Sequence, residues 1–384
     1  MNSGELRPLV ALDLSQVENQ TLGWGQFRYA VTLVEGLAAT NQARLLLFGT
    51  APVSREEFRP ALERFPDRCR YVQLPAYRGP GYYYHDVLRL SWRLFRHRVD
   101  VLHQLHTNIP PLKPCPVVVT GYHYYYDRAL FDTRPHRYYR WALRHRADLV
   151  ITISNATKRD YEVEYGLAPE RMRTVYPGLS PSLVATAPHR AERPYLMSPY
   201  SLSEPKNLRA LVLAWPSIAG RYPALELVLY GRASPTEGRE REFDELVRGL
   251  RHGDRIRRVG HLDDAALAER LAGCELFVFP TTVEGFGLPL LEAMANGACC
   301  ITRNASAMQE VGGDAVFLVE TRDPDAIAHA AVDLLADRSR RSELGRLARE
   351  RARRFTVEAM AEQTIECYRA VMNPGRRIGN EGSA

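Results

Sequence analysis

Short apolar runs alternate with helical stretches along the chain, and this alternation constrains the possible folds more than any other feature of the sequence. A short apolar run is typical of a strand buried on both faces, and the intervening helices supply the crossovers that parallel strands require. We therefore expect an α/β architecture with parallel sheets. The runs interpreted as strands are residues 9–14, 43–48, 99–102, 117–120 and 149–153, then 195–197, 225–230, 257–259, 276–279, 298–302 and 315–319.

The alternation pauses at the segment Val175-Tyr-Pro-Gly178 and then restarts, which indicates two successive α/β units. The chain has 384 residues, more than one ordinary core needs and suited to two domains of about 150–200 residues. We expect a first domain over residues 1–178 and a second over residues 179–356. Residues 357–384 then form a last helix, predicted over 360–372, and a tail.

The basic excess of the chain lies entirely in its first half. Residues 1–190 contain 25 Lys and Arg against 17 Asp and Glu, a net charge of +8, which leaves −2 for the remainder of a chain whose total is +6. This asymmetry predicts an anionic partner for the first half. The sequence lacks zinc-finger spacing and RNA-binding aromatic signatures, so we do not expect nucleic acid. The charged stretch 332–354 is interpreted as one helix with a solvated face.

Several features favour a cytoplasmic location. No stretch approaches 18 uninterrupted apolar residues, and the first residues do not resemble a secretory signal. The six cysteines form no CxxC pair and no disulfide-like spacing, which suits free thiols in a reducing compartment.

Two stretches, residues 89–98 and 134–146, combine arginines with Trp, Phe or Tyr at helical spacing. Basic amphipathic helices of this kind can lie on anionic membranes. The alternative is a pair of ordinary helices whose apolar sides face a sheet. We favour packing over insertion, and retain electrostatic attraction to the inner face of the cell membrane as an expectation.

The segment from Phe277 to Gly297 carries the clearest chemical signal. A strand ends at Pro280, and Gly-Phe-Gly-Leu-Pro then opens a helix, whose free amides form a seat for an anion such as a diphosphate. Glu284 precedes this helix and Glu292 lies about one turn inside it, so both carboxylates can accept hydrogen bonds from sugar hydroxyls in one cleft. The alternative is that Glu284 caps the helix and Glu292 is a solvated helix residue.

Glu284 and Glu292 match the E-x7-E motif of retaining glycosyltransferase family 4, together with its F-G-L-P core. The likeness extends along nearly the whole chain and is strong because the motifs keep their order and spacing. The other matching segments are Leu22–Tyr29, Leu149–Thr157, Arg173–Gly178, Glu204–Leu208, Val259–Leu262 and Gln309–Ala315.

The resemblance implies the GT-B fold: two facing Rossmann-like domains, the first for the acceptor and the second for the nucleotide sugar, with the last helix crossing back to the first. It also implies that Glu284 contacts the donor sugar and Glu292 the ribose. Lys206 would hold the diphosphate. The other residues implied at the donor are Asn207, Gly260 and the amides of Phe286, Gly287 and Leu288, with Gly23 and Gly25 in a loop near donor and acceptor.

Two positions depart from the family pattern. Pro205 stands where an arginine usually precedes the lysine, so one cation for the diphosphate is missing, and Arg232 is a candidate to replace it. Tyr200 stands near a usual glycine, where a bulky side chain could crowd the donor. These departures motivate an alternative function, a catalytically impaired GT-B binding or scaffold subunit.

In the first domain, His123 matches loosely the histidine of the family's "HD" loop, and we expect it at the reaction centre. The alternative is a lone surface histidine. The tyrosine clusters Tyr82–Tyr84 and Tyr124–Tyr126 could stack on a saccharide or simply pack. Of His103 and His106, we expect at least one to have a packing role.

The expected function is metal-independent transfer, with retention, of a hexose from a nucleotide diphosphate sugar to a hydroxyl of a saccharide or glycolipid. No cofactor is expected beyond this co-substrate. The N-terminal loop suggests GDP-mannose as the donor. No metal site is expected, because Asp323-Pro-Asp325 is interpreted as a helix cap rather than a metal-binding motif.

Overall fold

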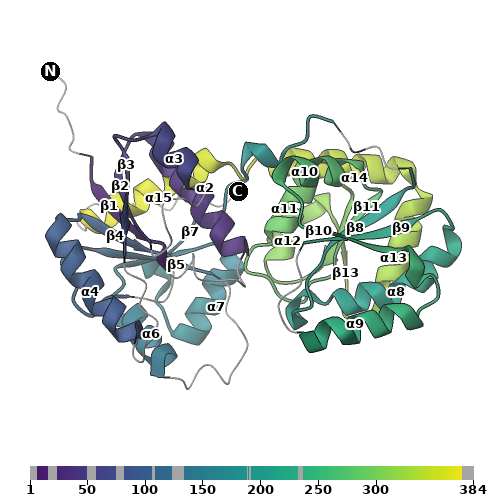
Figure 1. Ribbon diagram of the computed structural model, residues 1–384, viewed down its shortest axis with the longest axis horizontal. Coiled ribbons are helices and arrows are strands. Elements are labelled where there is room, and N and C mark those ends of the chain that lie inside the picture. Colours follow the sequence, from purple (N-terminus) through teal and green to yellow (C-terminus); the bar gives the residue numbers. More distant parts are fainter. Residues whose placement is uncertain are drawn as a thin grey trace. The chain divides into compact units, whose positions relative to one another are not determined.

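The computed structural model describes residues 7–15, 24–49, 58–74, 82–105, 109–122, 134–187, 189, 192–231 and 237–373. The chain divides into two compact units, one of residues 1–178 with 356–384 and one of residues 179–355. Each unit is a parallel sheet with helices on both faces (Figure 1).

The sheet of the first unit has seven parallel strands in the order β3-β2-β1-β4-β5-β6-β7. The central strands are buried along nearly their whole length, as their apolar runs predict. The strands are β1 (Leu9–Asp13), β2 (Arg44–Gly49), β3 (Cys69–Gln73), β4 (Val101–Gln104), β5 (Val117–Gly121), β6 (Leu149–Thr152) and β7 (Met172–Thr174).

Helices cover both faces of this sheet (Figure 1). Side chains of α4, α6 and α7 share one hydrophobic core, and α2 packs against α15. Gly36 allows α2 and α15 to approach closely, because a Cβ atom there would lie 2.8 Å from Val357. The helices are α2 (Trp24–Thr40), α3 (Arg59–Arg64), α4 (Tyr82–His97), α6 (Arg134–His145), α7 (Asn155–Tyr165) and α15 (Val357–Met372).

The sheet of the second unit has six parallel strands in the order β10-β9-β8-β11-β12-β13. Its central strands β8 and β11 pair in register, with Leu276 opposite Leu196 and Phe277 opposite Met197. The strands are β8 (Tyr195–Pro199), β9 (Glu226–Tyr230), β10 (Ile256–Gly260), β11 (Leu276–Phe279), β12 (Cys300–Arg303) and β13 (Phe317–Val319).

The helices of the second unit form a layer on each face of its sheet (Figure 1). One face carries α8, α9 and α13 over a core that includes Trp215. The predicted helix over 332–354 is wrong as one element: the chain breaks at Asp337, whose carboxylate accepts a hydrogen bond from Arg340 N and caps α14. The helices are α8 (Leu208–Arg221), α9 (Glu237–Gly249), α10 (Asp264–Gly273), α11 (Leu288–Ala295), α12 (Ala307–Gly312), α13 (Pro324–Ala336) and α14 (Arg338–Ala352).

Asp323 caps α13 by accepting a hydrogen bond from the amide of Asp325, at 3.0 Å, so the interpretation of Asp323-Pro-Asp325 as a capping turn is confirmed. All six cysteines are free, as predicted.

Each sheet has a topological switch point, where the chain order reverses between adjacent strands. In the first unit this point lies between β1 and β4, and in the second it lies between β8 and β11. Open parallel sheets bind ligands beyond the carboxyl ends of the strands at such points. The loops that follow β8 and β11 are therefore the first place to look for a site in the second unit.

We predict that Gly178→Ala destabilises the first unit. A Cβ atom at Gly178 would lie 2.6 Å from backbone atoms of Thr356 and Val357, which cannot rotate away as a side chain would. Overpacking of this kind costs about 1–3 kcal/mol, which lowers the melting temperature by roughly 2–12 °C in a unit of this size. Calorimetry measures the melting temperature. Gly220→Ala is the control, because nothing lies within 4 Å of the position that a Cβ atom would take at Gly220. Equal melting temperatures for both variants would contradict the prediction.

Candidate functional site

Two loops meet beyond the carboxyl ends of β8 and β11. After β8 the chain makes a 3₁₀ turn, η3 (Glu204–Lys206), and after β11 it runs through residues 280–287 to the start of α11. Because β8 and β11 are adjacent and parallel, both loops leave the same edge of the sheet. This edge brings together Lys206 and Glu284, which lie 78 residues apart.

Lys206 and Glu284 form an ion pair, in which the ammonium group of Lys206 donates to Oε1 of Glu284. The Lys206 side chain is 34% exposed and that of Glu284 is 13% exposed. The Lys206 ammonium also lies 5.5 Å from the centroid of the Phe279 ring. The Glu284 carboxylate is thus held at the sheet edge, while the Lys206 ammonium remains accessible to an incoming anion.

Pro205 fixes the Lys206 turn to the Glu284 loop through its backbone. Its carbonyl accepts hydrogen bonds from the amide of Thr282, at 2.7 Å, and from the hydroxyl of Thr281, at 2.9 Å. The proline ring fixes φ at this position, and the two hydrogen bonds hold the direction of the carbonyl. The residue that replaces the expected arginine therefore supplies rigidity rather than charge.

Asn207 also fixes the turn that carries Lys206. Its backbone is left-handed, with φ of 50°, a conformation that asparagine tolerates better than most residues. Its side-chain amide donates to the carbonyls of Pro280, at 3.2 Å, and Thr321, at 2.7 Å. The side chain of this predicted donor-binding residue is thus engaged with the backbone of neighbouring loops.

Ser306 is a site residue that the sequence did not suggest. Its hydroxyl donates to the carbonyl of Glu284 at 2.5 Å, and lies 3.4 Å from the Glu284 amide. Ser306 has φ of 57°, an unusual value for a residue other than glycine. The strained backbone places the hydroxyl against Glu284, and only the structure reveals this.

The amino end of α11 has the features of an anion-binding site. Gly287 is its N-cap with φ of 94°, no side chain caps the helix, and its first turn has no acidic residue. Pro289 lies in that first turn, as predicted. A Cβ atom at Gly287 would lie 2.2 Å from Met308 Cε, so only glycine fits without a shift. Phe286 is buried against Phe355, and Leu288 is half-buried.

The alternative roles considered for the two glutamates are wrong. Glu284 does not cap α11, because Gly287 holds that position. Glu292 is not solvated, because its exposed fraction is 4%. Glu292 is thus a buried carboxyl group in the first turns of α11, close in sequence to the loop that carries Glu284.

Tyr200 does not stand free at the sheet edge. It is buried in the hydrophobic core of the second unit, where its ring makes an edge contact with Phe243 at 5.5 Å. The guanidinium of Arg258 lies 5.0 Å from the Tyr200 ring, and burial raises the pKa of the phenol. The expectation that this side chain could crowd a donor is therefore wrong.

The carboxyl ends of β8, β9 and β10 are tied together next to Tyr200. The amide of Tyr200 donates to Tyr230 O at 2.6 Å, and the amide of Gly231 donates to Gly260 O at 2.7 Å. Gly260 has φ of 71°, and nothing lies within 4 Å of the position of a Cβ there. Gly260, one of the residues implied at the donor, thus lies at an exposed turn of the backbone.

Other predicted residues are not part of this cluster. Gly25 is exposed near the start of α2, in the first unit. His123, Arg232 and Gly23 lie outside the described residues, as do His106 and Tyr124–Tyr126. His103 has a packing role, since it is fully buried between Tyr368 and Thr120.

The first unit has a polar cluster at its own switch point that sequence reasoning missed. The carboxylate of Asp13, at the end of β1, accepts hydrogen bonds from Ser15 Oγ at 2.6 Å and from Gln104 Nε2 at 3.0 Å. Burial raises the pKa of Asp13. The signal in the sequence is an aspartate that directly ends an apolar run, a pattern typical of the ligand edge of a parallel sheet.

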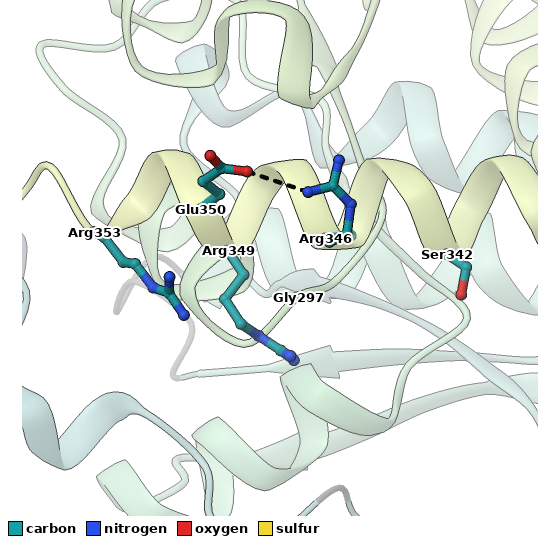
Figure 2. A pocket seen from close by; sticks show the side chains of 7 residues that line it. Gly297, Ser342, Arg346, Arg349, Glu350 and Arg353 are labelled. Atoms are coloured by element: carbon teal, nitrogen blue, oxygen red, sulfur yellow. Dashed lines mark hydrogen bonds and ion pairs between the residues drawn. The ribbon is translucent and has the colours of Figure 1, made fainter.

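A pocket of about 410 Å³ lies elsewhere, beside α14 and Gly297 (Figure 2). Gly297 precedes β12, so this pocket is at the amino edge of the sheet, opposite the Lys206–Glu284 loops. Two of the three arginines that line it have structural partners: Arg346 pairs with Glu350, and Arg349 donates to Asn296 O at 3.0 Å. We assign it no ligand.

Among the residues that the structure describes, no three His, Cys, Asp or Glu side chains gather closely enough to hold a metal ion. In the same residues, no helix has the length and apolarity needed to cross a membrane.

Comparisons with known proteins agree with this geometry. The family model described as Glycosyl transferases group 1 matches residues 184–351, and the model described as Glycosyltransferase Family 4 matches residues 25–183. The chain therefore has the GT-B fold, the fold of this class of glycosyltransferases. Within that class it belongs to glycosyltransferase family 4.

Characterised relatives include two mannosyltransferases. Phosphatidyl-myo-inositol mannosyltransferase of Mycolicibacterium smegmatis is 30% identical over 182 residues, 47% of this chain and 45% of that protein. O-antigen chain mannosyltransferase B of Escherichia coli is 30% identical over 242 residues, 58% of this chain and 61% of that protein. The matched segments thus span only about half of each relative.

Solved structures support the fold along nearly the whole chain. Sucrose-phosphate synthase of Thermosynechococcus elongatus has a TM-score of 0.78 at 22% identity, covering 96% of this chain and 100% of that one. Anabaena HepE in complex with UDP has a TM-score of 0.75 at 18% identity, covering 94% of this chain and 100% of that one.

Proposed function

We propose that the chain transfers a hexose, with retention of configuration, from a nucleotide diphosphate sugar to a hydroxyl of a saccharide or lipid-linked glycan. The observation that carries this proposal is the Lys206–Glu284 pair beside the open amino end of α11. A cation and the amides of a helix start that no side chain caps suit a diphosphate, and a carboxylate beside them suits sugar hydroxyls.

The proposed reaction breaks the bond between the sugar C1 and the diphosphate oxygen and forms a bond from C1 to the acceptor oxygen. The acceptor attacks the face from which the diphosphate departs, and a diphosphate oxygen takes the acceptor's proton. Lys206 and the amides of Phe286, Gly287 and Leu288 stabilise the charge that develops on the leaving group. Glu284 orients the sugar hydroxyls and Glu292 the ribose.

We propose that this reaction needs neither a metal ion nor a cofactor, because Lys206 and the α11 amides supply the positive charge that the leaving group requires. Full activity after treatment with EDTA is the expected result. His123 remains our choice for a residue at the reaction centre, and Arg232 for a second diphosphate cation, with Gly23 and Gly25 near the acceptor.

For the donor we propose GDP-mannose, since relatives at about 30% identity are named mannosyltransferases. We propose a cytoplasmic enzyme that works on the inner face of the cell membrane, where a lipid-linked acceptor would lie. The alternative, a catalytically impaired scaffold subunit, now rests on Pro205 alone, because Tyr200 packs in the core.

A thermal-shift screen against GDP, UDP, dTDP and ADP tests the donor site. At 100 times its dissociation constant, a nucleotide that binds only the folded protein stabilises it by about 2.7 kcal/mol. We expect GDP to raise the melting temperature of the wild type, and to raise that of Glu292→Ala by less. Glu245→Ala, an exposed change on α9, is the control and should respond as the wild type does.

If no nucleotide shifts the wild type, the donor site is not functional and the scaffold alternative replaces the transferase. If UDP rather than GDP shifts it, the transferase stands and the mannose donor is wrong.

A further inference from the structure

Helix α4 has apolar side chains on two opposite sides. Leu90 and Leu94 are buried in the core of the first unit, as the packing interpretation requires. Leu88, Trp92 and Phe95 are not: their exposed fractions are 57%, 61% and 73%. The spacing i, i+4 and i+7 places these three on one stripe along the helix. The packing interpretation is therefore confirmed for the side of α4 that carries Leu90 and Leu94, and it does not account for the exposed stripe.

Arginines border the exposed stripe. Arg89 and Arg96 are exposed and seven residues apart, on the same side of the stripe, and the Arg96 guanidinium lies 5.6 Å from the Trp92 ring centroid. Arg93 differs, because it is half-buried and its charge acts on Asp13. The outward side of α4 thus combines large apolar groups with exposed positive charges.

Helix α6 extends this surface. It packs through Tyr139, Ala142 and Leu143 on the same core as α4, so both helices lie on one side of the sheet (Figure 1). Its outward side presents Trp141, 41% exposed, and Arg137. Neither residues 88–98 nor residues 134–147 contain an acidic side chain.

These observations indicate a partner that is apolar within and anionic at its surface. Indole and phenyl rings favour the boundary between lipid headgroups and acyl chains, and guanidinium groups bind the phosphates of anionic lipids. A folded protein partner would need a matching apolar groove, whereas a bilayer accepts a single convex helix.

We propose that the outward sides of α4 and α6 dock on an anionic bilayer, with Leu88, Trp92 and Phe95 entering the interface and Arg89, Arg96 and Arg137 binding lipid headgroups. The docking surface is separate from the Lys206–Glu284 loops, which belong to the other unit. The proposal does not depend on the sugar-transfer chemistry proposed above.

Flotation of the full chain with lipid vesicles tests this surface. We expect binding to vesicles of phosphatidylcholine with phosphatidylglycerol, and little binding to phosphatidylcholine alone. Trp92→Ser combined with Phe95→Ser should lower the partition coefficient at least about tenfold. Arg89→Gln combined with Arg96→Gln should lower it about tenfold, and added salt should then have less effect.

Matched controls keep the result specific. Val163→Ser removes an apolar side chain that is 78% exposed on α7, and Arg241→Gln combined with Arg251→Gln makes the same charge change on the second unit. Both should bind vesicles as the wild type does. In addition, brominated lipids should quench tryptophan fluorescence in the wild type, and less in Trp92→Phe.

Three results would overturn the proposal: no vesicle binding by the wild type, unchanged binding by Trp92→Ser/Phe95→Ser, or a wild-type dimer that this variant converts to a monomer. The last would make the surface an interface between two copies. Nucleotide-dependent thermal shifts should be the same in all of these variants, so a failure of docking is distinguishable from a failure of the donor site.

Discussion

Replacing Lys206 with methionine should lower kcat/KM for sugar transfer about 1,000-fold, the scale on which a single donor to a developing oxyanion acts. Methionine keeps the length of the side chain and removes its charge. The ammonium group of Lys206 is the cation that the structure places against Glu284, next to the open amino end of α11. Without it, the departing diphosphate loses the cation nearest to Glu284 and keeps the helix amides and the proposed Arg232.

Two further variants separate this electrostatic role from folding. Lys206→Arg restores the charge with a different shape, so it should recover part of the activity. Lys158→Met removes another of the three lysines, on α7 of the first unit, and should leave kcat/KM within about twofold of the wild type. Activity of Lys206→Met within about tenfold of the wild type would contradict the assignment of Lys206 to the leaving group.

How Glu284 is held could not be predicted from the sequence. The E-x7-E spacing indicates a carboxylate before α11, and the family resemblance gives it a role. The contacts that orient it, with Lys206 and Ser306, come from residues 78 positions before it and 22 positions after it in the chain. A local sequence pattern does not indicate which loops lie together at one edge of a parallel sheet.

Pro205 and Tyr200 also show what could not be predicted from the sequence. Both depart from the family pattern, and the sequence alone made each a reason to doubt donor binding. In the structure Pro205 contributes a carbonyl, which any residue possesses, and Tyr200 points into the core. A sequence motif records only which side chains are present. The effect of Pro205 depends on its backbone carbonyl, and that of Tyr200 depends on the direction of its side chain.

The buried strands of both sheets were predictable from the sequence, whereas edge strands were predicted only in the second sheet, where they are β10 and β13. The central strands have unbroken apolar runs, such as Leu276–Phe279, because helices cover both of their faces. The sequence missed β3 and β7, the two edges of the first sheet. Only Cys69 is buried in β3 and only Met172 in β7, so neither has an apolar run to detect.

The first unit should lose stability in acid more steeply than its His103→Gln variant does. His103 is fully buried, with Nδ1 2.7 Å from the Tyr368 hydroxyl and Nε2 2.7 Å from that of Thr120. Burial lowers its pKa from 6.5 to about 3. Between these values the unfolded chain binds a proton that the folded chain does not, so the free energy of unfolding falls as pH falls from 6.5 towards 3.

The expected difference in slope reaches about 1.4 kcal/mol per pH unit, because one proton separates the two states. Urea unfolding between pH 4.5 and 7.5 measures it: His103→Gln should be less stable at pH 7.5, and the gap should close at pH 4.5. His145→Gln, an exposed change on α6, should give a curve parallel to that of the wild type. Parallel curves for His103→Gln as well would mean that His103 is not a buried neutral group. Since Tyr368 lies on α15, closing of the gap would show that this helix is held to the first unit through an uncharged imidazole.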